Sequence, residues 1–317
     1  MSNDEARPPK VWTTLITNTD YLPGLLTLDF SLKKVNSKYP LVALYTDSFS
    51  AEGHKALDAR GILKQRVDYL LPSTPKEYDN DPRFYDCWSK LTPFSLVEYE
   101  RVVQLDSDML VLKNMDELME MELDPPSMAG NGNRVFAACH ACACNPLNKS
   151  HYPADWIPKN CAYTSQHSTP DEAQITGPDP NTALGMPNGG LQVVNPSKGI
   201  YDKIVARLAD TITSSYDFAD QSLLGDVFSG RWVALPYIYN ALKTLRWEGV
   251  HDSIWRDGEV KNVHYILSPK PWNEWELHST DWSELVKNTK DKSHVWWFSV
   301  NEERKKKERL QGIVDSF

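Results

Sequence analysis

Short apolar segments alternate with helix-like segments through the first half of the chain. The segments rich in β-branched and apolar residues are 11–17 (VWTTLIT), 41–46 (LVALYT), 67–71 and 101–105 (RVVQL). Each has the length and composition of a buried strand. Between the first two, Leu25, Leu28 and Leu32 recur at helical spacing and predict an amphipathic helix. This order predicts an α/β fold with a mostly parallel, doubly wound sheet that carries helices on both faces.

The regular pattern is interrupted at residues 129–186, which are rich in Cys, Asn, Pro, Gly, Ser and Thr and show little periodicity. A loop of that length is unusual inside a compact domain, so we interpret it as an insertion that folds over a site. Regular structure resumes with a predicted strand at 191–195 and a predicted helix at 201–212. The predicted organisation is a polar tail at 1–10, one domain at 11–280 and a helical tail at 281–317.

Composition narrows the classes of function. The chain has 317 residues and a formal net charge of −9, and no long basic block runs through it, so nucleic acid is not an expected partner. The charge run at 302–309 is expected to form a solvated helix face. Residues 1–10 lack the apolar core of a signal peptide, and no apolar run approaches the roughly 20 residues that span a bilayer. We therefore expect a cytoplasmic protein without a membrane anchor.

An acidic pair follows the fourth predicted strand. Asp106 and Asp108 flank Ser107 directly after the RVVQL segment. In doubly wound sheets, ligands bind beyond the carboxyl ends of the strands. Two carboxylates there can converge on Mg²⁺ or Mn²⁺, which favour oxygen ligands together with substrate phosphates. The alternative is a pair of acidic turn residues, but a carboxylate next to a buried strand is partly desolvated and needs a partner.

Three further motifs are candidates for ligand binding. Residues 264–272 (HYILSPKPW) offer an imidazole for a metal and the Lys270 ammonium for a phosphate oxygen, although a lone histidine is more often structural. Residues 217–221 (DFADQ) either begin a helix with Asp220 as its cap or bind sugar hydroxyls. The glycines of residues 187–190 (PNGG) either allow close approach of a ligand or form a turn.

The cysteines allow two interpretations. The chain has five of them, Cys87, Cys139, Cys142, Cys144 and Cys161, and the odd count without a signal peptide predicts reduced thiols. A structural Zn²⁺ requires about four ligands, and no second C-x₂-C pair follows the first. We therefore favour buried free thiols, which pack as small apolar groups, over a zinc site.

The motifs together resemble those of family 8 glycosyltransferases, the group that includes glycogenin, plant galactinol synthase and bacterial lipopolysaccharide galactosyltransferases. The resemblance runs from position 11 to about position 272. It is carried, in the family's order, by TLITNTDYLPGLLTLDFSL, CWSKLTPFSLVEYERVVQLDSDMLVLKNMDELME, PNGGLQVVNPS, DFADQSLL and HYILSPKPW. It implies a GT-A type fold, a UDP-sugar donor, and transfer with retention of the anomeric configuration.

The resemblance also implies roles for individual residues. The metal, Mn²⁺ or Mg²⁺, is expected on Asp106, Asp108 and His264. The donor is expected to be bound by Leu15, Thr17, Asn18, Tyr21, Lys90, Asp106, Ser107, Asn188, Gly189 and Lys270. The expected catalytic residues are Lys90, Asp217, Asp220 and Gln221. Asp220 is the only nearby carboxylate that we consider as a covalent nucleophile, so a same-face mechanism and a double displacement stay open.

Two positions depart from the family pattern. The family often has Gly three residues after the metal histidine, where this chain has Leu267, which puts a backbone contact to phosphate in doubt. Glycogenin carries an acceptor tyrosine before that histidine, whereas residues 241–263 contain none. Self-glucosylation is therefore disfavoured, although Tyr237 and Tyr239 lie just before that stretch.

The expected reaction moves glucose or galactose from a UDP-sugar to a hydroxyl of a small-molecule or glycan acceptor, with a small polyol such as inositol as one candidate. The alternatives are a glycogenin-like glucosyltransferase and a catalytically silent UDP-sugar-binding protein. A nucleotidyltransferase would require a glycine-rich phosphate loop after the first strand, where this chain has Asn18-Thr19-Asp20-Tyr21. A homodimer is a further expectation.

Overall fold

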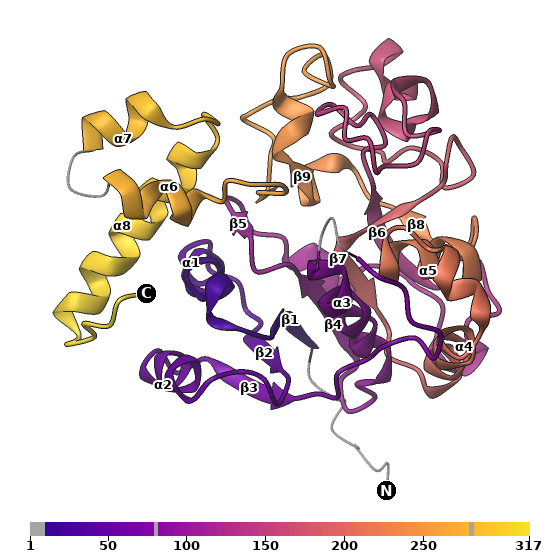
Figure 1. Cartoon of the computed structure of the whole chain (residues 1–317), viewed down its shortest axis with the longest axis horizontal. Coiled ribbons are helices and arrows are strands. Elements are labelled where there is room, and N and C mark those ends of the chain that lie inside the picture. Colours follow the sequence, from indigo (N-terminus) through magenta and orange to yellow (C-terminus); the bar gives the residue numbers. More distant parts are fainter. Residues whose placement is uncertain (1–9, 79–81, 279–281) are drawn as a thin grey trace, which may run out of the picture.

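The computed structural model describes residues 10–78, 82–278 and 282–317 and is built around a seven-stranded sheet (Figure 1). The strands lie in the order β3-β2-β1-β4-β7-β6-β8. Their bounds are Lys10–Ile16 (β1), Leu41–Tyr45 (β2), Leu63–Arg66 (β3), Arg101–Leu105 (β4), Phe136–His140 (β6), Pro187–Val194 (β7) and Val233–Ala234 (β8). Only β7 is antiparallel to its neighbours, β4 and β6, so the mostly parallel sheet predicted from the sequence is confirmed.

Helices cover both faces of this sheet, as predicted. The α-helices are α1 (Leu22–Lys34), α2 (Ala51–Ala59), α3 (Arg83–Cys87), α4 (Lys198–Leu208), α5 (Ala219–Val227), α6 (Pro271–His278), α7 (Trp282–Asn288) and α8 (His294–Leu310). Apolar residues of α1 and α2 share one core with Trp12 and Ile16 of β1. Residues of α4 and α5 share another core with Phe136 of β6. The leucines predicted to form one helical face, at positions 25, 28 and 32, are all buried in α1.

Short 3₁₀ helices fill many connections. They are η1 (Thr19–Tyr21), η2 (Trp88–Ser95), η3 (Asp116–Glu120), η4 (Pro126–Met128), η5 (Pro158–Asn160), η6 (Ala162–Ser168), η7 (Thr211–Ser215), η8 (Tyr237–Tyr239) and η9 (Lys243–Arg246). The third strand lies at Leu63–Arg66, not at the predicted 67–71. It is the edge strand of the sheet, and its polar sequence LKQR lacks the apolar pattern that marks buried strands.

A second, three-stranded sheet brings distant segments to the edge of the first. Its order is β5-β10-β9, with bounds Met109–Val111 (β5), Asn262–His264 (β10) and Ala241–Leu242 (β9). Because β5 follows β4 after three residues, the acidic pair lies in the connection between the two sheets. The antiparallel register of β5 and β10 sets His264 opposite Met109, next to that connection.

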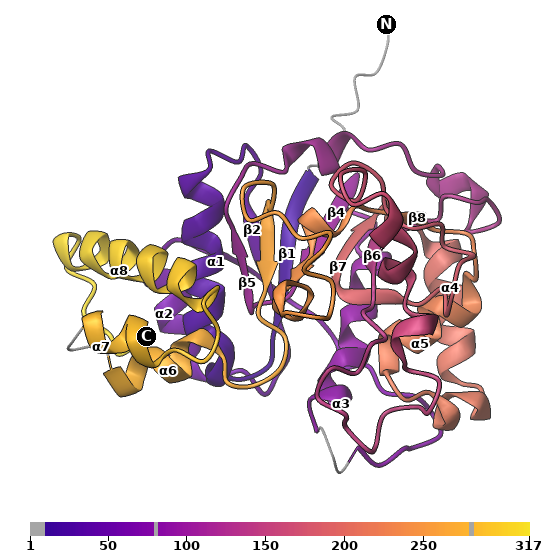
Figure 2. The same ribbon diagram turned by 90° about the horizontal axis from the view of Figure 1, so that it is seen from above.

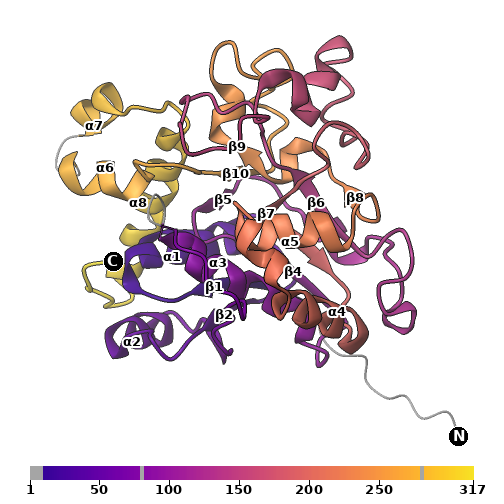
Figure 3. The same ribbon diagram turned by 45° about the vertical axis from the view of Figure 1, so that its right-hand side comes forward.

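The segment predicted as an insertion, 129–186, has two parts. It begins with β6 of the large sheet and continues from position 141 to 186 as irregular chain with η5 and η6. Figures 1 and 3 show this irregular chain beside the turns that precede β10. Its buried residues, among them Tyr163 and Ala173, share a core with Leu242 of β9 and Val263 of β10.

The C-terminal helix α8 packs on α1, and α6 packs on α8 (Figure 2). Thr27 Oγ1 of α1 donates to Asn301 Oδ1 of α8 at 3.2 Å. The charge run was expected on a solvated face, but Arg304 is fully buried and its Nη1 donates to Glu308. Glu308 also pairs with Arg60 at 2.8 Å. Packing on α1 therefore turns part of the charge run inward, where each charge has a partner. No helix in the described part of the chain combines the length and apolar character that a membrane crossing requires.

Candidate active site and metal centre

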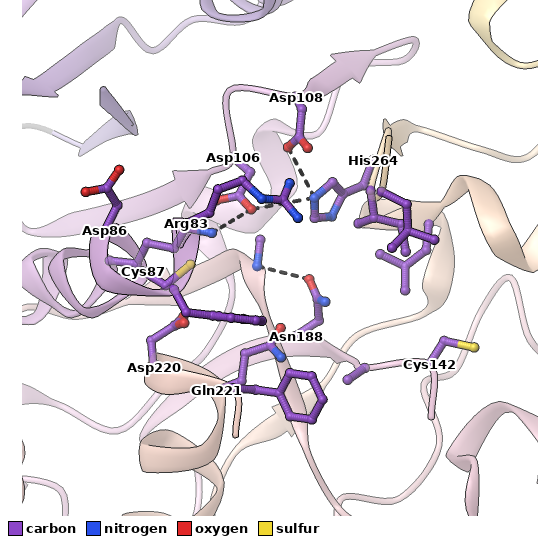
Figure 4. Close-up of a pocket in the computed structure, with 18 of the residues that line it drawn as sticks. Arg83, Asp86, Cys87, Asp106, Asp108, Cys142, Asn188, Asp220, Gln221 and His264 are labelled. Carbon is purple, nitrogen blue, oxygen red and sulfur yellow. Dashed lines mark hydrogen bonds and ion pairs between the residues drawn. The ribbon is translucent and has the colours of Figure 1, made fainter. Parts of the chain in front are cut away.

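The strand ends surround a cleft of about 260 Å³ (Figure 4). The carboxyl ends of β1 and β4 and the start of the antiparallel β7 lie at one edge of the sheet, and the end of β10 faces them. Most residues predicted to bind donor or metal or to act in catalysis line this cleft: Leu15, Thr17, Asn18, Tyr21, Lys90, Asp106, Ser107, Asp108, Asn188, Asp220, Gln221, His264 and Lys270. Positions far apart in the sequence therefore lie around one cleft.

Asp106, Asp108 and His264 form a cluster that fits a divalent cation. Their ligand atoms lie within 4.8 Å of one another. His264 Nε2 is 3.2 Å from Asp108 Oδ1 and 3.5 Å from Asp106 Oδ2. Two carboxylates and one imidazole leave several coordination positions for phosphate oxygens and water, an arrangement suited to Mn²⁺ or Mg²⁺.

A buried amide that the sequence analysis did not single out orients the histidine. Asn240, fully buried at the end of η8, places its Oδ1 2.8 Å from His264 Nδ1. Its Nδ2 donates to Asn188 Oδ1 at 2.8 Å, and Asn188 Oδ1 also accepts from the Gly190 N–H. If His264 Nδ1 carries the proton, its Nε2 lone pair is directed at the two carboxylates. No motif marks Asn240, because its partners are 24 and 52 positions away.

We expect Asn240→Ala to weaken metal binding more than donor binding, because Asn188 keeps its hydrogen bond from the Gly190 N–H. Loss of a partner that orients a metal-binding histidine typically lowers metal affinity about 10- to 100-fold. The Mn²⁺ concentration for half-maximal activity should rise by that factor, while the KM for donor at saturating Mn²⁺ changes little. An unchanged Mn²⁺ requirement would contradict this positioning role.

Two lysines neutralise the acidic pair. Lys90 Nζ donates to Asp106 Oδ2 at 2.8 Å, and Lys270 Nζ donates to Asp108 Oδ2. Burial opposes the charge on Asp108, but Lys270 and His264 outweigh it and hold the pKa of that carboxyl well below its ordinary value. Burial likewise opposes the charge on Lys90, yet Asp106 raises its pKa well above the ordinary value. The Asp108 carboxylate is therefore kept ionised, which metal binding requires.

The opposite wall of the cleft carries Asp220 and Gln221 at the start of α5 (Figure 4). Asp220 is not the helix cap, which is Phe218. It is 2% exposed, and burial raises its pKa to about 7, against the opposing effect of Lys90. Gln221 Oε1 accepts from the Gly189 N–H at 2.9 Å. A Cβ at position 189 would lie 2.0 Å from Asp220 Oδ2, so any larger residue there would displace the Asp220 carboxyl.

Two predicted site residues do not line the cleft. Gly189 lies behind it and acts through its contacts with Asp220 and Gln221. Asp217 pairs with Lys76 Nζ at 2.8 Å, and its side chain is half exposed. Asp217 precedes α5 and does not line the cleft, whereas Asp220 in the first turn of α5 does.

The cleft also contains residues of α3 that the motifs did not identify. Asp86 Oδ2 accepts from Thr17 Oγ1 at 2.8 Å, and Asp86 Oδ1 accepts from the Tyr69 hydroxyl at 2.8 Å. Arg83 Nη1 donates to the Tyr21 hydroxyl at 3.0 Å. Both residues stand just before the CWSKL motif, and that position is the only signal for them in the sequence.

Leu267, where relatives often have glycine, lies in the cleft wall with a φ of 64°. This left-handed conformation is one that glycine adopts without cost. A leucine there stores backbone strain of about 1–3 kcal/mol, which the surrounding structure must hold in place. Leu267 therefore holds a backbone conformation that favours glycine.

The fold and site define the class of protein. The α/β fold, with its mostly parallel sheet and an Asp-x-Asp pair at a strand end, is of the GT-A glycosyltransferase type. Solved structures support it: the galactosyltransferase LgtC, in complex with donor and acceptor sugar analogs, has a TM-score of 0.57 at 16% identity, over 92% of this chain and 96% of that one. The glycosyltransferase GlyE of Streptococcus pneumoniae TIGR4 has a TM-score of 0.52 at 19% identity, over 88% of this chain and 63% of that one.

The chain belongs to glycosyl transferase family 8, whose model matches residues 13–276. The resemblance found in the motifs is thereby confirmed. Among similar proteins, galactinol synthase 1 of Solanum lycopersicum is 28% identical over 92% of this chain and 81% of that protein. Galactinol synthase 1 of Arabidopsis thaliana is 27% identical over 96% of this chain and 82% of that protein.

Proposed function

We propose that this glycosyltransferase moves a hexose from a UDP-sugar to a hydroxyl of a separate small acceptor, with retention of the anomeric configuration and with Mn²⁺ or Mg²⁺. One observation carries the proposal. Asp106, Asp108 and His264 face Asp220 and Gln221 across one cleft, so that a diphosphate and the sugar attached to it have sites on opposite walls. The names of the relatives, galactinol synthase and galactosyltransferase, favour galactose over glucose.

The cation would be held by Asp106, Asp108 and His264, and it would neutralise charge on the departing diphosphate. Lys90 and Lys270 are bonded to the two carboxylates and can turn to phosphate oxygens once a cation binds there. Thr17 and Asp86 offer hydrogen-bonding groups for a uracil ring. The Tyr21 ring packs edge-on against the Trp272 ring, with ring centroids 5.5 Å apart, and supplies an aromatic wall of the cleft.

Retention requires either that the acceptor attacks the anomeric carbon from the face on which the leaving group departs, or that two displacements occur in succession. Gln221 is a poor nucleophile, and its carbonyl oxygen is held by the Gly189 N–H. Asp220 is the candidate for covalent attack, but its raised pKa keeps part of it protonated near neutral pH. We therefore favour same-face attack, in which Asp220 and Gln221 bind and polarise the sugar at the reacting carbon.

The acceptor side of the cleft suits a compact polyol. Trp156 stacks on Phe218 with ring centroids 4.1 Å apart, and both line the cleft beside Tyr152. Aromatic faces can pack against the C–H groups of a polyol ring. The hydroxyl groups of that ring then stay free to form hydrogen bonds. We propose that the irregular chain at 141–186 closes this end of the cleft and limits hydrolysis of the donor by water.

The glycogenin-like alternative is disfavoured because the two tyrosines just before residues 241–263 are not placed as acceptors. Tyr237 is fully buried, and its hydroxyl accepts from the Arg256 N–H at 2.8 Å. Tyr239 donates to Glu117 Oε1 at 2.8 Å. Neither lines the cleft. The silent-binder alternative would not need an acidic pair and a histidine that both remain positioned for a cation.

The test is an assay with purified protein, Mn²⁺, UDP-galactose or UDP-glucose, and inositol or simple sugars as acceptors. We expect UDP release that depends on the acceptor, and an α-linked product by NMR from the α-linked donor.

UDP should bind more tightly than ADP or GDP by calorimetry. The intact mass of the protein should stay constant when it is incubated with donor and Mn²⁺. A ladder of hexose additions to the protein would favour the glycogenin-like alternative, and equal affinity for the three nucleotides would contradict a uridine-specific pocket.

A further inference from the structure

A second cluster of ligating side chains lies outside the acidic centre. Cys142 and Cys144 follow β6, Cys161 precedes η6, and His251 lies in the turns between β9 and β10. The three sulfurs and one ring nitrogen of His251 all lie within 4.8 Å of one another. Cys144 Sγ is 3.1 Å from His251 Nε2, and Cys161 Sγ is 3.3 Å from it.

These spacings are close to those of a four-coordinate zinc site. With Zn–S of about 2.3 Å and Zn–N of about 2.0–2.1 Å, a tetrahedron places neighbouring ligand atoms roughly 3.5–3.8 Å apart. The observed Sγ–Nε2 separations are a few tenths of an ångström shorter, so a small expansion would admit the ion. Three thiolates and one imidazole form a closed Cys₃His set, which is typical of structural zinc rather than catalytic zinc.

His251 is held in the orientation that a ligand requires. The ring is fully buried, and its Nδ1 lies 2.8 Å from His167 Nε2. A proton on Nδ1 donated to His167 leaves the Nε2 lone pair directed at the sulfurs. Metal-binding histidines commonly use their other nitrogen in this way. The exposed His167 thus fixes the tautomer of the buried His251.

Cys139 shows what a non-ligating thiol looks like in this chain. Its Sγ is buried and donates to the Pro236 carbonyl at 3.2 Å, apart from the cluster. A disulfide would use two of the clustered sulfurs and leave the third facing an imidazole nitrogen, and all five cysteines are free. Free thiols were expected because no second C-x₂-C pair follows the first, and the spacing gave no sign of a distant histidine ligand. His251, 90 positions beyond Cys161, is that ligand.

We propose that Cys142, Cys144, Cys161 and His251 bind a structural Zn²⁺ ion that joins the irregular segment to the turns before β10. The site is chemically distinct from the acidic centre, because soft thiolates select zinc whereas carboxylates select Mn²⁺ or Mg²⁺. It is also next to the cleft. Cys142 itself lines the cleft, and so do Asn145, Leu147 and Trp156 from the loop that Cys144 and Cys161 would close. The ion therefore fixes the acceptor-side wall.

The first experiment counts zinc. The full-length protein is loaded with Zn²⁺ under reducing conditions, freed of excess metal and analysed by mass spectrometry for elements. We expect about one zinc ion per chain, released when a mercurial reagent modifies the thiols. Cys161→Ser and His251→Ala should lose the zinc, whereas Cys139→Ser, a matched change at a buried thiol outside the cluster, should keep it.

Two further measurements keep the proposal open to refutation. If the ligand variants fail to fold, the wild-type protein loaded with Co²⁺ should show thiolate charge-transfer bands and the d–d absorption of a tetrahedral site. Asp108→Asn should retain zinc, which separates this site from the proposed catalytic metal and makes zinc content independent of activity. Wild-type protein that holds well below one zinc, or an intact mass that reveals a disulfide among these cysteines, would overturn the proposal.

The structural role has its own readout. Removing zinc should speed amide hydrogen exchange in residues 145–160, which the ion would hold closed, while exchange in β1 and β4 stays slow. Equal exchange in that loop with and without zinc would rule out the positioning role.

Discussion

Replacing Asp108 with Asn is expected to abolish most sugar transfer, with a fall in kcat of about 10³-fold or more at saturating Mn²⁺. Asp108 is buried, and its two oxygens face His264 and Lys270. Asparagine removes the negative charge that holds the cation and leaves the Lys270 ammonium buried without a carboxylate. Mn²⁺ titration of activity, with calorimetry for Mn²⁺ binding, measures both losses.

The matched control is Asp58→Asn, the same chemical change at an exposed residue that pairs with Lys64. It should leave activity and Mn²⁺ binding at wild-type levels. Because the unpaired Lys270 lowers stability in Asp108→Asn, a circular dichroism melt must show that this variant is folded at the assay temperature. A folded Asp108→Asn protein with wild-type kcat, or wild-type activity that persists in excess chelator, would refute the acidic metal centre.

Replacing Asp220 with Asn should lower activity by about 10²- to 10³-fold and, at the same time, raise stability above neutral pH. Asp220 lies beside Gln221 at the proposed reacting carbon, so the substitution replaces a carboxyl group there with a neutral amide. Burial raises its pKa to about 7, which means that its ionised form is costly in the folded protein. Activity and stability therefore change in opposite directions at one residue.

The raised pKa of Asp220 determines how the stability of the wild-type protein changes with pH. An aspartate has a pKa near 3.9 when unfolded, so between about pH 4 and pH 7 the unfolded chain releases a proton that folded Asp220 retains. Wild-type stability falls with pH through that window, and the asparagine variant lacks this loss. The difference in free energy of unfolding should grow from near zero at pH 4 to as much as about 4 kcal/mol at pH 8.

Denaturant melts of both proteins at pH 4, 6 and 8, without donor or added Mn²⁺, measure this difference. Asp202→Asn, an exposed change on α4, serves as the control and should leave activity unchanged. A stability difference between Asp220→Asn and wild type that is flat with pH would mean that Asp220 is not held protonated in the folded protein.

The local and sequential features of this protein were determined by the sequence alone. The β-branched run of β1 and the helical leucines of α1 specified their elements, because each pattern depends only on which face of one element is buried. The acidic pair was identifiable because it follows a buried strand, whose carboxyl end must lie at the ligand-binding edge. The order of five motifs then indicated the family, and with it His264 and Lys270, which their spacing alone would not have connected to the pair.

Only the tertiary structure decided which distant side chains meet. Asn240 orients His264, Asp86 meets Thr17, and His251 completes a set of three cysteines, although no spacing connects these residues. Arg304 was expected in solvent and is buried, because α8 packs on α1. In each case the partner comes from another segment, and its position is set by how sheets and loops pack. Periodicity records only whether a side chain faces inward, whereas packing decides what it meets there.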